Sequence, residues 1–424
     1  MRLASYLSLL RQNPSFTRLY AAQLISFGGD WFATVALLGL SLELTGSSAL
    51  AALVLVLQTG GFAISSPIAG TLADRFDRRK LMIAADLARV PVALAFLLAR
   101  DPGTLWIAFV AVALLAVGSA VFEPSSSAAL PNLVDPDRLP EANVLIGSAW
   151  GTMLAVGAGL GGVVAATLGR DAAFIANAGS FALSALLIVG IQRPFQEPRE
   201  KGDGRGGGLR GVGRSVATAI GFARESRLVA SLLLSKTTFG VGTGVVLMLA
   251  VFGRNVFGAG DAGIGLLFAA RGLGALLGPF VARSLVGLED RGLLLGIRAS
   301  LVVVVVCYAL FPIAPGIWIA ALLVFAAHLG GGSQWMLSTF GLQRSTPDHI
   351  RGRVFSLDYG LVTLTIALST LLAGFLADAL APRLAVWTMV ALIVLSGSLW
   401  VWFSRPALAR AGRTAGRPLS RRTR

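Results

Sequence analysis

Long apolar runs, separated by short polar or Pro- and Gly-containing breaks, extend over most of the chain. Most of these runs approach the roughly 20 residues that a helix needs to cross the ~30 Å hydrocarbon core of a bilayer. In the first half the pattern predicts membrane helices at 19–42, 49–72, 81–99, 105–129, 142–168 and 171–192. In the second half it predicts them at 229–257, 262–285, 293–311, 317–341, 354–380 and 384–404.

Residues 193–228 separate the two sets of runs and concentrate proline, glycine and charge. The glycines favour a flexible linker, within which residues 215–226 can form a short surface helix. Both sets share one rhythm, with a short turn after the first run, a charged turn after the second and a Pro-Asp turn after the fourth. The pattern divides the chain into a six-helix bundle at 1–192, a linker at 193–228, a second six-helix bundle at 229–404 and a basic tail at 405–424.

Composition agrees with a membrane protein, because 55% of the 424 residues are hydrophobic and only 13% are charged. Soluble domains average roughly 25% charged residues. The formal net charge of +15 would suit nucleic-acid binding only if the basic side chains gathered on one soluble face. They lie instead in the turns between apolar runs, so we expect no nucleic-acid partner. The single cysteine, Cys307, excludes an intrachain disulfide.

The basic residues alternate between the two sides of the predicted helices. If the N-terminus is cytoplasmic, 29 of the 36 lie in cytoplasmic segments, which include the linker and the tail. Span ends are counted with the side on which they lie. Those on the external side are then Arg100, Arg170, Arg254 and Arg383, and those deep within spans are Arg89, Lys236 and Arg271. Cytoplasmic loops of membrane proteins carry an excess of Lys and Arg. We therefore expect both termini to lie in the cytoplasm.

The most specific string lies between the second and third spans and reads Gly70-Thr-Leu-Ala-Asp74-Arg75-Phe-Asp77-Arg78-Arg79-Lys80. It resembles the signature G-x-L-A-D-R-x-G-R-R-K of the major facilitator superfamily of transporters, with Asp77 in place of a glycine. The resemblance implies an all-α membrane fold of twelve helices, arranged as two pseudo-symmetric six-helix bundles around a central cavity.

The same resemblance implies a conformational switch on the cytoplasmic side. Its residues would be Gly70, Asp74, Arg75, Arg78 and Arg79. In the family the aspartate equivalent to Asp74 caps the eleventh helix, which begins near residues 351–355 here. The glycine removes a side chain where two helices approach closely. The alternative is that the basic residues of the string only anchor the topology.

The fifth span contains Gly157, Gly161 and Gly162, in a stretch that resembles the exporter-associated pattern G-P-x-x-G-G. Ala158 stands where that pattern has proline. Small residues let helices pack closely, and glycine is also common in membrane helices in general. The stretch therefore gives modest support to export.

Asp30 lies within the first span, where a carboxylate is costly unless it faces a wet cavity, a partner or a proton path. We predict that it binds and releases protons, and the alternative is a structural ion pair with a neighbouring helix. The further candidates for proton coupling or for the substrate cavity are Trp31, Glu123, Lys236, Arg271, His328 and Trp335. Either Lys236 or Arg271 would provide the counter-charge of Asp30 or contact an anionic substrate, and the sequence leaves that choice open.

Strings such as ADRFDRRKL, FEPSSSAALPNLV and RGRVFSL resemble the bacterial branch that contains siderophore exporters and macrolide or multidrug efflux proteins. We expect a monomeric antiporter of the bacterial inner membrane that exports an amphiphilic small molecule, such as a drug or siderophore, by alternating access. Its partners would be the substrate, protons and membrane lipids. The proton gradient would be its energy source, with no cofactor.

Two alternatives are a transporter of lysophospholipid or a similar lipid and a non-transporting membrane receptor. The sequence contains no motif typical of a nucleotide-binding P-loop, a zinc cluster or a hydrolase nucleophile. We therefore expect neither an enzyme nor a metal site.

Overall fold

The computed structural model describes the backbone of residues 3–196 and 209–415. It describes their side chains except at 3–4, 67, 70–71, 73–75, 209–215, 348–349 and 413–415. Within these residues, twelve helical segments are long and apolar enough to cross a membrane, which confirms the predicted count.

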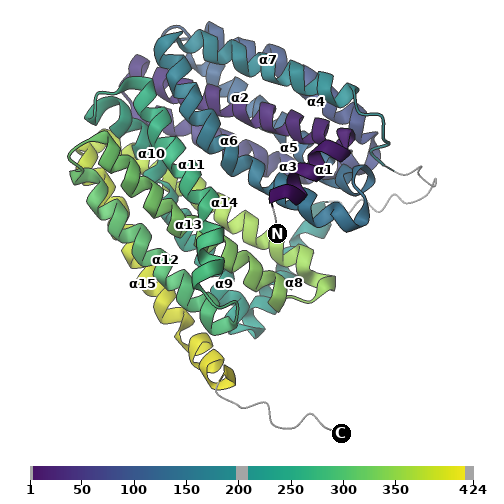
Figure 1. Cartoon of the computed structure of the whole chain (residues 1–424). Helices are drawn as coiled ribbons and strands as arrows, with labels where there is room; N and C mark the ends of the chain where they lie inside the picture. The colour runs from purple at the N-terminus through teal and green to yellow at the C-terminus, as the bar shows by residue number, and fades with distance from the viewer. Residues whose placement is uncertain (1–2, 197–208, 416–424) are drawn as a thin grey trace.

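The helices form two bundles that lie side by side, the first in purple to teal and the second in green to yellow (Figure 1). The membrane helices of the first bundle are α2 (Pro14–Thr45), α3 (Ser48–Arg75), α4 (Arg78–Leu94), α5 (Leu105–Leu133), α6 (Leu139–Thr167) and α7 (Arg170–Val189). Those of the second are α9 (Arg227–Thr243) with α10 (Val245–Val251), α11 (Gly260–Leu285), α12 (Asp290–Leu310), α13 (Ile317–Ser345), α14 (Asp348–Ala379) and α15 (Pro382–Ala415).

Shorter elements complete the chain. Helix α1 (Leu3–Gln12) precedes the first span and α8 (Leu209–Glu225) lies between the bundles, so the predicted surface helix begins earlier than residue 215. Short turns of 3₁₀-helix are η1 (Ala95–Leu98), η2 (Pro136–Arg138) and η4 (Phe311–Ile313), and η3 (Phe252–Val256) is a π-helical turn. The last helix continues past residue 404 into the predicted tail.

Helix boundaries follow local capping chemistry. Asn13 caps α2, since its side-chain oxygen accepts a hydrogen bond from the backbone amide of Phe16. Gly46 ends that helix with a φ of 65°. Asp77 caps α4 by accepting the amide of Lys80 at 2.9 Å. The residue that departs from the signature therefore has a structural reason, because a glycine there could not supply this side-chain acceptor.

The two ends of the helix array differ. Because the spans alternate in direction, the start of α2 and the end of α15 share one side, which we call the terminal side. The most extensive contacts between the bundles are those of α6 with α11 and of α3 with α14. Both pairs make close contacts on the opposite side, near the start of α11 and the end of α14.

Glycines bring α6 and α11 into backbone contact at this opposite side. A Cβ atom on Gly162 would lie 2.7 Å from the carbonyl oxygen of Asp261 and from the Cα of Gly265. A Cβ atom on Gly265 would lie 2.7 Å from the carbonyl oxygen of Ala158. Any side chain at either glycine would force the two bundles apart.

The junction of α3 and α14 is polar. The carboxylate of Asp378, at the end of α14, accepts the backbone amides of Ser48 at 2.5 Å and Ala49 at 3.1 Å. It also accepts the Ser47 hydroxyl at 2.7 Å. A carboxylate of the second bundle thus caps the N-terminus of a helix of the first, where the positive end of the helix dipole favours it.

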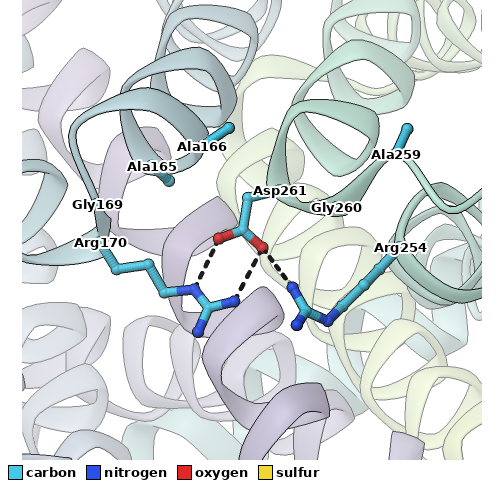
Figure 2. A pocket seen from close by; sticks show the side chains of 8 residues that line it. All are labelled: Ala165, Ala166, Gly169, Arg170, Arg254, Ala259, Gly260 and Asp261. Atoms are coloured by element: carbon cyan, nitrogen blue, oxygen red, sulfur yellow. Dashed lines mark hydrogen bonds and ion pairs between the residues drawn. The ribbon is translucent and has the colours of Figure 1, made fainter.

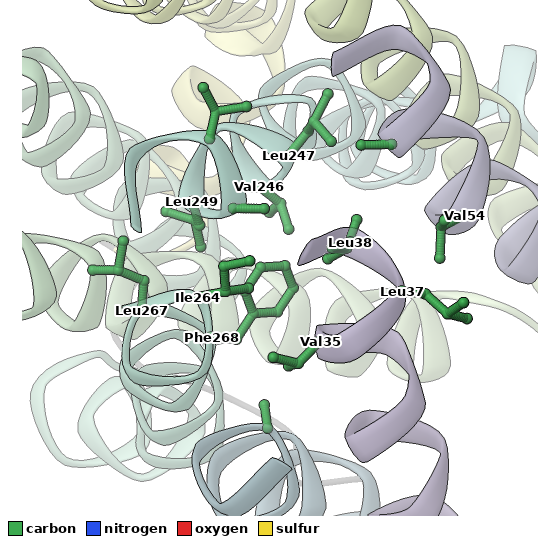
Figure 3. Close-up of a cluster of buried hydrophobic side chains, with 14 of the residues drawn as sticks. Val35, Leu37, Leu38, Val54, Val246, Leu247, Leu249, Ile264, Leu267 and Phe268 are labelled. Carbon is green, nitrogen blue, oxygen red and sulfur yellow. The ribbon is translucent and has the colours of Figure 1, made fainter. Parts of the chain in front are cut away.

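A buried apolar cluster lies beside these junctions (Figure 3). Helices α2 and α3 contribute Val35, Leu37, Leu38 and Val54, and α10 and α11 contribute Val246, Leu247, Leu249, Ile264, Leu267 and Phe268. All are at most 4% exposed. The cluster fills the space between the bundles on the opposite side, which is therefore closed by side chains as well as by helix backbones.

We predict that Gly162→Val destabilises the closed opposite side by about 1–3 kcal/mol, because the added side chain overlaps the backbone of α11. The matched control is Gly147→Val on the same helix, where a Cβ atom would meet nothing within 4 Å. Thermal unfolding in detergent, followed by tryptophan fluorescence, measures both. Equal shifts in melting temperature would contradict the interpretation.

Candidate functional site

A cluster of four charged side chains joins the bundles on the opposite side, and Figure 2 shows three of them, Arg170, Arg254 and Asp261. The carboxylate of Asp261 on α11 accepts hydrogen bonds from Arg170 Nε at 2.7 Å and from Arg254 Nη1 at 3.0 Å. Glu43 at the end of α2 accepts one from Arg170 Nη2 at 2.8 Å and one from Arg254. Since Glu43 and Arg170 belong to the first bundle and Arg254 and Asp261 to the second, each arginine bridges the two bundles. We call these four residues the closing cluster.

Asp261 is 6% exposed, so its charge is largely removed from water. A Cβ atom on Gly39 of α2 would overlap its carboxylate, which means that Asp261 packs directly onto the backbone of the first bundle. A buried carboxylate costs several kcal/mol unless charged donors satisfy it. Arg254 belongs to the same bundle as Asp261, so it is the donors of Arg170 that reach this carboxylate only while the bundles remain together.

A cavity of about 1260 Å³ lies between the bundles. It extends from Leu37 and Val246, next to the apolar cluster, to Ser127 and Arg353 toward the terminal side. Helix α8 reaches its wall through Val216. The space can hold a drug-sized molecule, and apolar and aromatic side chains form most of its wall.

The charges of the cavity wall are divided between the bundles. Asp30 and Glu123 belong to the first bundle, whereas Arg271 and Arg353 belong to the second. Among the described residues, neither Asp30 nor Glu123 has a side-chain hydrogen bond or ion pair. Charged groups that stay unpaired in a membrane-embedded cavity are available to a proton or a ligand.

Two of the aromatic residues proposed from the sequence also lie in this wall. Trp31 follows Asp30 on α2, and Trp335 projects from α13. Trp150 on α6 and Tyr359 on α14 join them. The cavity therefore contains Asp30, Trp31, Glu123, Arg271 and Trp335 of the predicted candidates.

Lys236 and His328 lie behind the wall. Lys236 pairs with Asp358 at 1% and 0% exposure, and its ammonium lies 4.6 Å from the ring centre of Trp335. It is therefore not the counter-charge of Asp30. His328 contacts the Tyr308 hydroxyl at 2.8 Å, inside the second bundle.

The first bundle also contains a buried pair behind its wall. Asp86 and Arg89 on α4 form an ion pair, and the Arg89 guanidinium lies 4.2 Å from the ring centre of Phe181. Arg89 also donates to Ser119 Oγ at 3.2 Å, and Ser119 lines the cavity. Each bundle thus holds an internal pair next to the cavity, besides the unpaired charges that face it.

Two basic residues of the proposed switch, Arg78 and Arg79, bind within the first bundle. Arg78 donates to the carbonyl oxygens of Ala128 at 2.8 Å and Phe195 at 3.4 Å, and Arg79 donates to that of Val189. The side-chain environments of Gly70, Asp74 and Arg75 lie outside the described residues. The proposed contact of Asp74 with α14 therefore stays a prediction.

The glycines of the fifth span pack against two neighbouring helices, α2 and α11. A Cβ atom on Gly157 would lie 3.1 Å from Gly28, and one on Gly161 would lie 2.7 Å from Phe32 Cα, both on α2. Gly162 faces α11 instead. The motif therefore holds α6 against its own bundle and against the other one.

The sequence patterns did not predict the closing cluster. Arg170 and Arg254 stood out only as two of the few basic residues on the external side, and Asp261 and Glu43 carried no proposed role. The available signal was charge of both signs at span ends on the side that is poor in basic residues.

Comparison with known sequences gives a consistent picture. Residues 4–418 match the family model described as transmembrane secretion effector. The enterobactin exporter EntS of Shigella boydii is 27% identical over 385 residues, which cover 82% of either chain. The putative bacilysin exporter BacE of Bacillus subtilis is 25% identical over 369 residues, which cover 86% of this chain and 89% of that protein. The uncharacterized MFS-type transporter YfiS of Bacillus subtilis is 27% identical over 186 residues, and the match spans 44% of either chain.

Solved structures share the fold. A bacterial homolog of the human lysosomal transporter Spinster, in an inward-facing and unoccupied conformation, has a TM-score of 0.72 at 14% identity, over 92% of this chain and 96% of that one. A bacterial homologue of the iron transporter ferroportin, in an inward-facing state, has a TM-score of 0.69 at 17% identity, over 94% and 99%. At these identities the likeness concerns the fold alone.

We predict that Asp261→Asn opens the opposite side, because the two arginines then share only Glu43 as a charged partner. The reporter is Ala165→Cys, next to the closing cluster, in a background where the buried Cys307 is replaced by serine. Its labelling by a membrane-impermeant maleimide should accelerate about tenfold or more, since a charge-assisted hydrogen bond contributes about 1.5–3 kcal/mol.

The control for this prediction is Asp171→Asn. Asp171 lies on the same side and pairs with Arg100 at 2.9 Å, but that pair is exposed and within one bundle. The same acceleration in both variants would show that the closing cluster does not hold the bundles together.

Proposed function

We propose that this chain, which belongs to the transmembrane secretion effector family within the major facilitator superfamily, is a proton-coupled exporter of amphiphilic small molecules. Membership in this family makes the chain a transporter and not an enzyme. EntS and BacE are named as exporters, of enterobactin and putatively of bacilysin, and we extend export of drug-like or siderophore-like molecules to this chain.

One observation supports proton coupling above the others. Asp30 and Glu123 face the cavity without an ion-pair or hydrogen-bond partner among the described residues, whereas the nearby carboxylates Asp86 and Asp358 each form an ion pair within their own bundle. A carboxylate kept in such a position is suited to exchange a proton for a hydrogen-bond donor of the substrate.

Transport then follows from the two arrangements of the bundles. With the opposite side closed, substrate enters the cavity from the terminal side, and its donor groups displace the proton from Asp30 or Glu123. Separation of the closing cluster and closure of the terminal side expose the same cavity to the opposite side. There the substrate leaves and a proton returns to the carboxylates, so the proton gradient supplies the energy.

This mechanism needs an orientation and a membrane. We place the terminal side in the cytoplasm of a bacterial cell, because 29 of the 36 basic residues then follow the positive-inside rule. The chain would lie in the inner membrane. One chain builds the whole cavity, so a monomer suffices for transport.

The test uses proteoliposomes with an imposed pH gradient, followed with a pH-sensitive dye while siderophores, macrolides and cationic dyes are added in turn. We expect at least one of them to accelerate proton movement through the wild-type protein. Asp30→Asn should reduce that movement to the level of empty liposomes, because the amide cannot release a proton.

The control is Asp101→Asn, in an exposed turn outside the cavity, which should transport like the wild type. Proton movement that persists unchanged in Asp30→Asn would remove this residue from coupling. Translocation of a spin-labelled lysophospholipid without any response to the panel would favour a lipid substrate. A folded protein that moves neither would favour a receptor.

A further inference from the structure

Arg271 differs from the other basic residues placed within the spans. Arg89 and Lys236 each pair with a carboxylate of their own bundle. Arg271 lines the cavity, and no hydrogen bond or ion pair joins its guanidinium to another described residue. A cation in this position lacks the counter-charge that would offset its desolvation.

Aromatic rings surround this guanidinium. Its central carbon lies 5.9 Å from the ring centre of Trp31, 5.8 Å from that of Trp150 and 5.7 Å from that of Phe268. Trp31 also lies 6.2 Å from Trp150, edge to face, so the two indoles form a corner beside the charge. Such contacts stabilise a cation by cation–π attraction, but they provide no hydrogen-bond acceptor for its five N–H groups.

The two indoles belong to the first bundle and Arg271 belongs to the second. They meet beside the crossing of α6 and α11, where a Cβ atom on Gly272 would overlap the backbone at Ala155. The arrangement is therefore held in place by the tight helix contact, and it exists only while the two bundles are close at this level.

We propose that Arg271, Trp31 and Trp150 form a subsite for an anionic group, such as a carboxylate or sulfonate, that is attached to an aromatic ring. The planar guanidinium can bind two oxygens of such a group in parallel. The attached ring stacks on the indole of Trp150, which is 45% exposed, and touches the smaller exposed edge of Trp31. The proposal rests on the proposed function, since it assigns part of the substrate cavity to one chemical class.

The subsite complements the carboxylates of the first bundle. Asp30 and Glu123 accept hydrogen bonds or protons, whereas Arg271 accepts negative charge. A substrate with a donor group and an anionic aromatic group would contact both bundles at once. Its binding would then depend on their relative position, as alternating access requires.

The test uses 8-anilinonaphthalene-1-sulfonate and its uncharged counterpart N-phenyl-1-naphthylamine, with the protein in lipid nanodiscs. Energy transfer from tryptophan to the probe reports binding near the indoles, and empty nanodiscs correct for probe in the lipid. Arg271→Gln should weaken binding of the sulfonate about tenfold or more and leave binding of the uncharged probe unchanged.

Two matched variants separate charge from folding. Arg271→Lys keeps the charge but loses the bidentate geometry, so the affinity should lie between those of wild type and Arg271→Gln. Arg283→Gln makes the same charge change at an exposed position of the same helix, and it should bind both probes like wild type.

The proposal is overturned if wild type shows no saturable binding of the sulfonate, if Arg271→Gln binds it as wild type does, or if both probes weaken in parallel. Binding that depends on Arg271 without any substrate-driven proton movement would contradict the coupling but not the subsite. Proton coupling together with Arg271-independent binding would contradict the subsite alone.

Discussion

The closed side of the molecule depends on one carboxylate of the second bundle that is fully satisfied only when it also contacts the first. Asp261 packs on Gly39 and binds Arg170 across the interface, while Arg254 completes its shell. Burial of this charge is favourable only in that geometry. Its position therefore fixes the start of α11 against α2 and α7, and with it the glycine crossing of α6 and α11.

The junction of α3 and α14 follows the same principle, with backbone amides in place of guanidinium groups as the donors. Asp378 satisfies amides at the start of α3 that no residue of that helix can satisfy from within. In both junctions, a polar group of one bundle finds its hydrogen-bond partner on the other bundle. The apolar cluster between them adds buried surface, but apolar contacts are not directional and do not fix the relative position of the bundles. The bundles can separate and meet again in the same register, since the polar contacts specify it.

The cavity shows why charged residues within membrane spans have different roles. Arg89 and Lys236 are enclosed with a carboxylate, and they stabilise the interior of their own bundles. Asp30 and Arg271 face open space and have no such partner among the described residues. The distinction does not depend on residue type, because each class contains both signs. It depends on whether the side chain faces an oppositely charged residue or the cavity.

The twelve spans were predictable because a bilayer demands long apolar runs, and Asp30 or Arg271 interrupts such a run visibly. Pairings were not predictable, since Lys236 meets Asp358 at a separation of 122 residues. The closing cluster was less visible still. Asp261 lies near a span end, where charge is inexpensive, so the sequence carries no sign that folding buries it.

The composition of the closing cluster also has an electrical consequence. Two carboxylates and two guanidinium groups meet there, so the cluster as a whole is neutral. Moving one elementary charge through a membrane potential of 100 mV changes the free energy by about 2.3 kcal/mol, whereas rearranging a neutral group moves no net charge. Separation of the closing cluster therefore does not itself respond to the membrane voltage. A voltage dependence of the transport cycle would arise from other charges, such as the unpaired Asp30 and Arg271 of the cavity wall or a bound ion, and not from the closing cluster.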